Sequence, residues 1–166
     1  TDDSVHWIDL ASHKDFARTA VGMRPRHAEF TADGKALWVS SEIGGEVQIL
    51  DTTSHAVTKT IAFAPPGVFK DKIMPVGIRF TPDRKQAVVA LGRADTLAIV
   101  DVASATVTGY IPVGRRVWHS AIDAAGSRVF SANGLSDNVS VVDLATKAVI
   151  ATIAVGRAPW GVVVAP

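Results

Sequence analysis

Hydrophobic and polar positions alternate along this chain in short runs that are separated by polar turns, and the runs come in groups of four. In one group the runs cover 28–30, 36–40, 47–50 and 56–61, and they are rich in Val, Ile, Trp and Thr. Alternation with a period of two over such short runs is typical of β-strands. The pattern therefore predicts an all-β protein of antiparallel strands joined by tight turns.

The groups themselves repeat along the chain. Each third run ends in an Asp that is followed three residues later by Ser or Thr, at Asp9, Asp51, Asp101 and Asp143, with spacings of 42, 50 and 42 residues. Four-stranded units of about 40 to 45 residues are typical of a β-propeller. An Asp at such a turn accepts main-chain N–H groups, so we interpret the four Asp residues as scaffold.

The repeats divide the chain into complete and partial blades. We expect strands three and four of a first blade over 1–21, complete blades over 22–61, 62–113 and 114–155, and the first strand of a closing blade over 156–166. Propellers hold about 4 to 8 blades, so this is about half of a ring, and the missing blades would come from another polypeptide or a second copy. The insertion at 62–74 is interpreted as a flap over the channel or as a tolerated surface loop.

Composition and short motifs restrict the function. The 17 basic and 16 acidic residues give a net charge of +1, which provides no overall attraction to nucleic acid or anionic membranes. The lack of cysteine excludes disulfides, thiolate metal sites and covalent c-type haem. No membrane span or signal peptide is visible. Phosphate-loop, serine-hydrolase and zinc-protease motifs are absent as well, so the sequence carries no positive signal for an enzyme.

The candidate binding residues lie in the loops on the face opposite the Asp turns, where the units differ most. Just before the expected inner strands these loops hold Arg24, Arg26, His27, Arg115, Arg116, Trp118, His119, Arg157 and Trp160. Arginine offers a planar fork for carboxylates, and tryptophan offers a flat apolar surface. The group therefore predicts a site at the channel mouth for a small, planar, anionic ligand.

Two alternative interpretations of these residues remain open. The arginines could instead bond main-chain carbonyls or the acidic loop residues Glu42, Asp95 and Asp137, while the tryptophans seal the channel. His27 and His119 occupy equivalent positions two blades apart, but two histidines without a third ligand are only weak candidates for a metal site.

Two resemblances follow from these segments. The repeat signature VGxxP, TxDGK and VxVIDxAT resembles the YVTN family of propeller repeats. The unit-specific segments RPRHAEFTADGKALWVSSEIGG from Arg24, PVGIRFTPD from Pro75, GRRVWH from Gly114 and GRAPWGVVV from Gly156 resemble the C-terminal half of β-propeller proteins associated with pyrroloquinoline quinone (PQQ)-dependent catabolism. The second resemblance implies a seven-bladed, periplasmic protein encoded near quinoprotein alcohol dehydrogenases.

The resemblance also implies a role. We expect a non-catalytic binding or accessory protein for PQQ-dependent alcohol oxidation, with PQQ as a candidate ligand of the arginines and tryptophans. A second hypothesis is a platform that docks a quinoprotein dehydrogenase or a cytochrome. A third is a propeller enzyme that uses metal or non-covalent haem, with His27 or His119 as a ligand.

Overall fold

The computed structural model describes residues 2–165, and all of the regular structure in this part is β-strand apart from two short 3₁₀ turns. A two-stranded sheet comes first, made of β1 (Ser4–Asp9) and β2 (Lys14–Ala20). Three four-stranded antiparallel sheets follow, and their strands are β3 (Pro25–Phe30), β4 (Ala36–Ser41), β5 (Glu46–Asp51), β6 (Val57–Ala62), β7 (Pro75–Phe80), β8 (Gln86–Leu91), β9 (Thr96–Asp101), β10 (Thr106–Pro112), β11 (Val117–Ile122), β12 (Arg128–Asn133), β13 (Asn138–Asp143) and β14 (Ala148–Ala154). The predicted fold class, a partial β-propeller of four-stranded blades, is confirmed.

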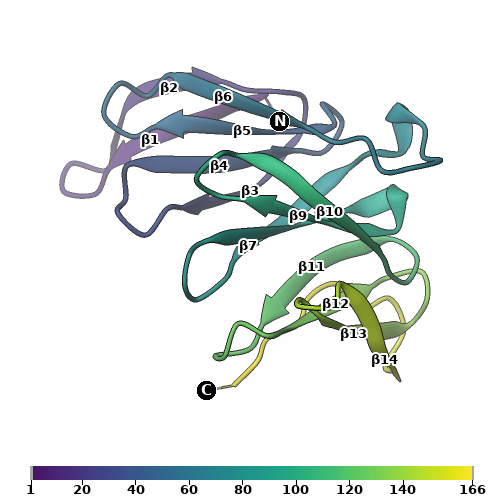
Figure 1. Cartoon of the computed structure of the whole chain (residues 1–166). Helices are drawn as coiled ribbons and strands as arrows, with labels where there is room; N and C mark the ends of the chain where they lie inside the picture. The colour runs from purple at the N-terminus through teal and green to yellow at the C-terminus, as the bar shows by residue number, and fades with distance from the viewer. Residues whose placement is uncertain (1, 166) are drawn as a thin grey trace.

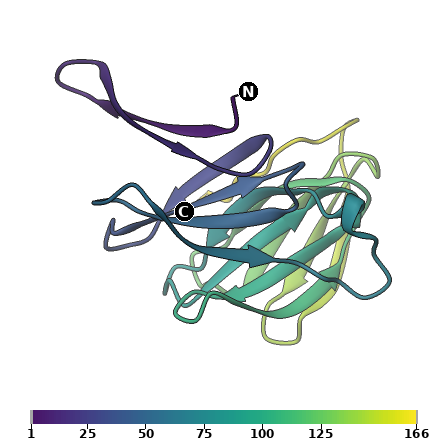
Figure 2. The ribbon, with the colours of Figure 1, turned by 90° about the horizontal axis from the view of Figure 1, so that it is seen from above.

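Within each sheet the strands pair in chain order, and successive sheets pack face to face in a fan (Figure 1). The first strands of the three complete sheets, β3, β7 and β11, contact one another and form the inner edge of the fan. Seen from above, the β1–β2 hairpin stands at the N-terminal end of the series (Figure 2). No helix in the described part of the chain is long and apolar enough to cross a membrane.

The repeated Asp residues form the turns between third and fourth strands. In every unit one carboxylate oxygen accepts hydrogen bonds of 2.6 to 2.8 Å from the main-chain N–H and the hydroxyl of the Ser or Thr three residues later. These bonds hold the pKa of each of the four carboxyls below its ordinary value, because they favour the ionised form. The geometry agrees with the interpretation of these residues as scaffold.

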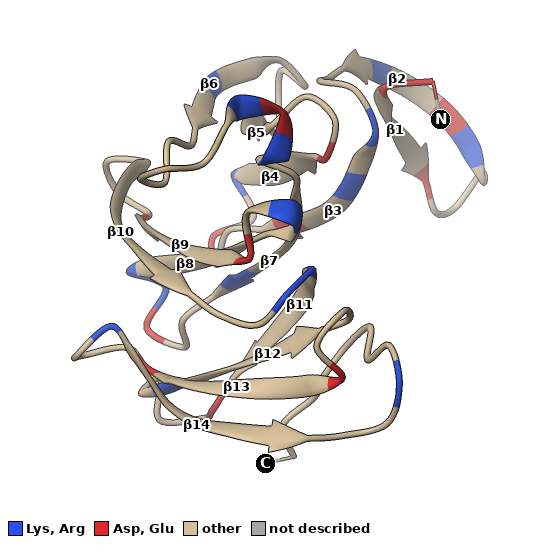
Figure 3. Ribbon diagram, turned by 90° about the vertical axis from the view of Figure 1, so that its right-hand side faces the viewer, with Lys and Arg blue, Asp and Glu red and all other residues tan. Residues whose placement is uncertain are grey.

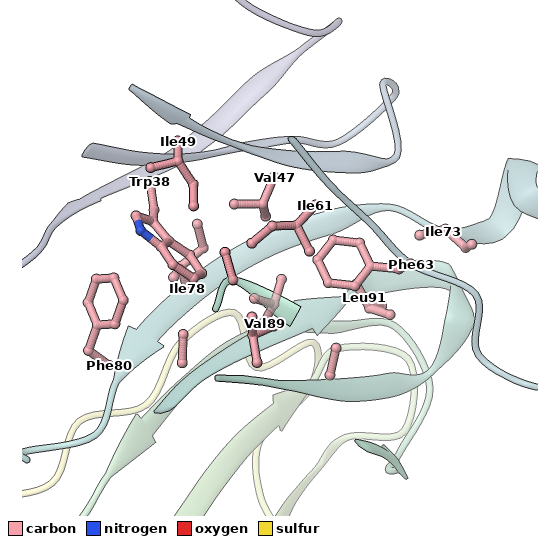
Figure 4. Close-up of a cluster of buried hydrophobic side chains, with 14 of the residues drawn as sticks. Trp38, Val47, Ile49, Ile61, Phe63, Ile73, Ile78, Phe80, Val89 and Leu91 are labelled. Carbon is pink, nitrogen blue, oxygen red and sulfur yellow. The ribbon is translucent and has the colours of Figure 1, made fainter. Parts of the chain in front are cut away.

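The largest core lies between the second and third blades. Trp38 and Ile49 of one sheet face Ile78 and Val89 of the next (Figure 4), and the Trp38 ring meets the Phe80 ring edge-on at 5.2 Å. A second core joins the third blade to the fourth, so the β7–β10 sheet is buried on both faces. A strand that is covered on both faces has no polar side, which explains the continuous apolar run of β8.

The structure corrects one expected segment, the closing strand, and describes another, the insertion at 62–74, in more detail. The described part of the expected closing strand, 156–165, forms no strand, because a β-strand needs a neighbour to pair with and residues 2–165 provide no partner strand for it. The insertion forms the loop between β6 and β7 with a 3₁₀ turn at Lys70–Lys72. Phe63 and Ile73 anchor its two ends in the core, while Phe69 at its tip is 78% exposed.

Candidate functional site

The loops that surround the channel mouth are joined by a repeated main-chain contact. In three of the four units, the residue directly before the third strand is an Asp. Its carboxylate accepts a hydrogen bond of 2.7 to 2.8 Å from a main-chain N–H of the next loop that leads to an inner strand. The three pairs are Asp3 with Arg24, Asp95 with Arg116, and Asp137 with Ala158. All six residues have φ between 52° and 58°, a left-handed conformation that Asp tolerates better than most residues. Asp95 and Asp137 therefore bind main chain here, not guanidinium groups.

Glu42, which directly follows β4, forms ion pairs with three of the predicted arginines. Its side chain is only 2% exposed, and Oε1 accepts a hydrogen bond of 2.8 Å from Nη2 of Arg116. The Nε atoms of Arg24 and Arg26 form ion pairs with Oε2 at 3.2 and 3.4 Å. One carboxylate thus faces three guanidinium groups, which leaves a local excess of positive charge.

Glu42 is a departure from the repeat. In three successive units, the residue after the second strand donates its main-chain N–H to a carbonyl of the loop that leads into the inner strand of the same unit. These residues are Glu42, Gly92 and Gly134. The other two units have glycine at this position, so only the second blade places a side chain there. This difference between aligned units is the sequence signal by which Glu42 could have been found.

Trp118, at the start of β11, forms a platform beneath two of these cations. The Arg116 guanidinium lies 4.2 Å from the centre of the indole ring, and that of Arg26 lies 5.7 Å away. The negative face of an indole attracts a cation at such distances. Arg116 also donates from Nη1 to Sδ of Met74 at 3.3 Å, so its guanidinium is held from two sides.

A groove of about 480 Å³ opens beside Trp118. Its lining comes from five loop segments and the start of β11, and contains Lys72, Arg93, Asp95, Arg115, Arg116, Trp118, Gly134, Leu135 and Ala158. Four of these side chains are cationic and one is acidic, and one oxygen of that acid already accepts the N–H of Arg116. Lys and Arg lie at the loop ends near β7 and β11, whereas β14 carries none (Figure 3). We refer to this feature below as the mouth groove.

The sequence predicted only part of the mouth groove. Arg115, Arg116 and Trp118 belong to it. Arg24 and Arg26 do not line it, although both form ion pairs with Glu42 and Arg26 also lies 5.7 Å from the centre of the Trp118 ring. Lys72 and Arg93 were missed, because neither belongs to a segment that combines Arg and Trp, as GRRVWH does. Lys72 belongs to the insertion, which therefore forms one wall of the groove.

The predicted histidines lie in a second cluster, on the inner strands. Glu29 of β3 forms an ion pair with Arg79 of β7 at 3.0 Å and contacts Nε2 of His27 at 3.4 Å. Burial raises the pKa of Glu29, but the hydrogen bonds from His27 and Arg79 outweigh it, so the pKa lies below its ordinary value. The His27 ring lies 5.4 Å from that of His119.

The remaining predicted residues stand apart from the mouth groove. Trp160 stacks on His119 with 4.5 Å between ring centres, beside a cavity of about 300 Å³ that Arg79 also lines. Arg157 is exposed and lines neither this cavity nor the mouth groove. Over residues 2–165, no three His, Asp or Glu side chains are grouped so that they could hold a metal ion.

His119 gives the chain a predictable dependence on pH. Burial, together with the positive charges of His27, Arg79 and Arg26, lowers its pKa to about 4. An unfolded histidine titrates near about 6.5, so the unfolded chain binds more protons between these values, and stability falls as the pH drops through this window. We expect His119→Gln to reduce the loss of stability between pH 7 and 4.5, as measured by denaturant unfolding. A variant that loses as much stability as the wild type over this range would contradict the expectation.

Together these features define a partial β-propeller whose channel mouth carries a cationic groove beside a tryptophan. Residues 2–154 match the family described as lactonase, 7-bladed beta-propeller, and the chain belongs to this family. A search of curated proteins found no match. A chain from the solved structure of Kuenenia stuttgartiensis hydrazine synthase is similar with a TM-score of 0.79 and 22% identity. The similarity covers 91% of this chain and 43% of that one, so this chain spans less than half of its length, and it shows the fold alone.

Proposed function

We propose that the mouth groove binds a small planar ligand that carries carboxylate groups, and that the chain is part of a non-catalytic binding or accessory protein. The observation that carries the proposal is the excess of four cationic side chains over one acidic side chain in the lining of a groove that also contains Trp118. The resemblance of the unit-specific loops to PQQ-associated propellers supports PQQ, a planar tricarboxylate, as the ligand. The same resemblance supports a periplasmic role linked to PQQ-dependent alcohol oxidation.

Different side chains of the groove would contact different parts of the ligand. Arg115 is exposed at the rim and offers a planar fork, while Lys72 and Arg93 approach from two other loops. Groups that converge from separate loops can contact carboxylates spaced around one ring system. Trp118 and Leu135 supply the apolar surface against which that ring would lie.

Titration with PQQ tests the proposal. We expect heat release and quenching of tryptophan fluorescence, and binding that weakens with added salt because the attraction is between charges. Arg115→Ala should weaken binding by at least about tenfold, since it removes one charge-assisted contact worth roughly 1.5 to 3 kcal/mol. Arg128→Ala is the matched control, because this exposed arginine lies at the turn on the opposite face. A wild-type chain that shows neither heat nor quenching refutes the proposal.

The family suggests a second candidate, the opening of a lactone ring. It is favoured by the cavity beside Arg79, His119 and Trp160, where His119 is neutral at pH 7 and could accept a proton. Release of acid from a simple lactone by the wild-type chain, and its loss in His119→Gln, would favour this activity. Capture of a quinoprotein dehydrogenase or cytochrome that depends on Arg115 would instead favour a docking platform.

A further inference from the structure

The buried carboxylate of Glu42 lies behind the mouth groove but does not line it. Both of its oxygens face arginines, and the side chain of Arg116, which it bonds most closely, is only 14% exposed. Arg116 also lines the groove, and its guanidinium lies 4.2 Å from the centre of the Trp118 indole ring. The groove is therefore connected to Glu42 through one guanidinium group.

We propose that Glu42 is a positioning residue for the mouth groove: it holds Arg116 and Arg26 at Trp118 so that the ring and its cations present one fixed surface to the ligand. The inference rests on the proposed function. Its physical basis is that Arg24, Arg26 and Arg116 repel one another, and long side chains move apart unless an opposite charge holds them. A site whose side chains are already held in place binds with a smaller loss of entropy.

Glu42→Gln separates positioning from a simple charge effect, because the two predict opposite results. Loss of a negative charge near the groove would by itself strengthen the attraction for an anion. If Glu42 positions Arg116, the variant instead binds PQQ about tenfold more weakly at constant ionic strength, since a buried hydrogen-bonded charge pair has lost one partner. The measurement is a calorimetric titration with PQQ.

Glu29→Gln is the matched control. Glu29 also holds arginines, Arg79 and Arg84, but it lies on the inner strand and outside the mouth groove. It is expected to leave PQQ affinity unchanged within about twofold, because none of the residues that it bonds lines the mouth groove. If Glu42→Gln does not fold by circular dichroism, Glu42→Asp is used, which keeps the charge but shortens the reach to Arg116.

The outcomes distinguish this inference from the proposed function. Weaker binding in Glu42→Gln but not in Glu29→Gln supports positioning, whereas equal or tighter binding in Glu42→Gln overturns it. If the wild-type chain binds no PQQ, the proposed function fails. The positioning role of Glu42 is then tested on the protein without ligand. Quenching of Trp118 by acrylamide, obtained by difference from Trp118→Phe, should then rise in Glu42→Gln as Arg116 leaves the ring, and an unchanged value would overturn the inference.

Discussion

Trp38→Ala is expected to destabilise the chain by about 3–5 kcal/mol, which is a large part of the roughly 5–15 kcal/mol that stabilises a typical domain. Trp38 is 1% exposed and packs between the second and third blades, where its ring meets that of Phe80. Truncation removes the burial of the indole and leaves a cavity between two sheets that are fixed by their own hydrogen bonds. Those sheets cannot close the space without breaking their strand pairing.

Denaturant unfolding followed by circular dichroism measures this effect. Trp160→Ala is the matched control, because the side chain of Trp160 is 57% exposed, and it should change the free energy of unfolding by less than about 1 kcal/mol. A similar loss for both variants would show that the packing between the blades does not dominate stability.

The sequence predicted the propeller because the fold is specified by local signals that recur. The four Asp turns and the alternating runs both depend on contacts between residues that are close in the chain. Less was predicted where a neighbouring blade decides the outcome. β8 does not alternate because sheets cover both of its faces, and the segment 156–165 pairs with nothing despite its strand-like composition.

The candidate site was predicted in part for the same reason. Arg115, Arg116 and Trp118 are adjacent in the chain and were found together, but the mouth groove also needs Lys72 and Arg93 from other loops. No local pattern marks their approach, since it follows from how the blades pack. Eight of the nine candidates divide among the mouth groove, the Glu42 cluster and the inner-strand cluster, while Arg157 stands apart from all three.

Arg116→Met is expected to weaken both the fold and the site. It removes the closest hydrogen-bond partner of the buried Glu42 carboxylate, and a hydrogen bond to a charged group is worth about 1.5–3 kcal/mol of stability. Arg24 and Arg26 remain near the carboxylate, but only through Nε contacts of 3.2 and 3.4 Å. The same change removes the nearer of the two cations over Trp118 and one positive charge of the groove, so affinity for PQQ should fall by at least about tenfold.

Arg115→Met is the matched control for this substitution, because it places the same side chain at the adjacent position. Arg115 is exposed and its side chain neutralises no buried acid, so its loss should lower PQQ affinity while the free energy of unfolding changes by less than about 0.5 kcal/mol. Unfolding in guanidinium chloride and titration with PQQ, applied to both variants, separate the two roles. If Arg116→Met is as stable as Arg115→Met, the Glu42 carboxylate does not depend on Arg116, and the connection between the buried cluster and the groove is lost.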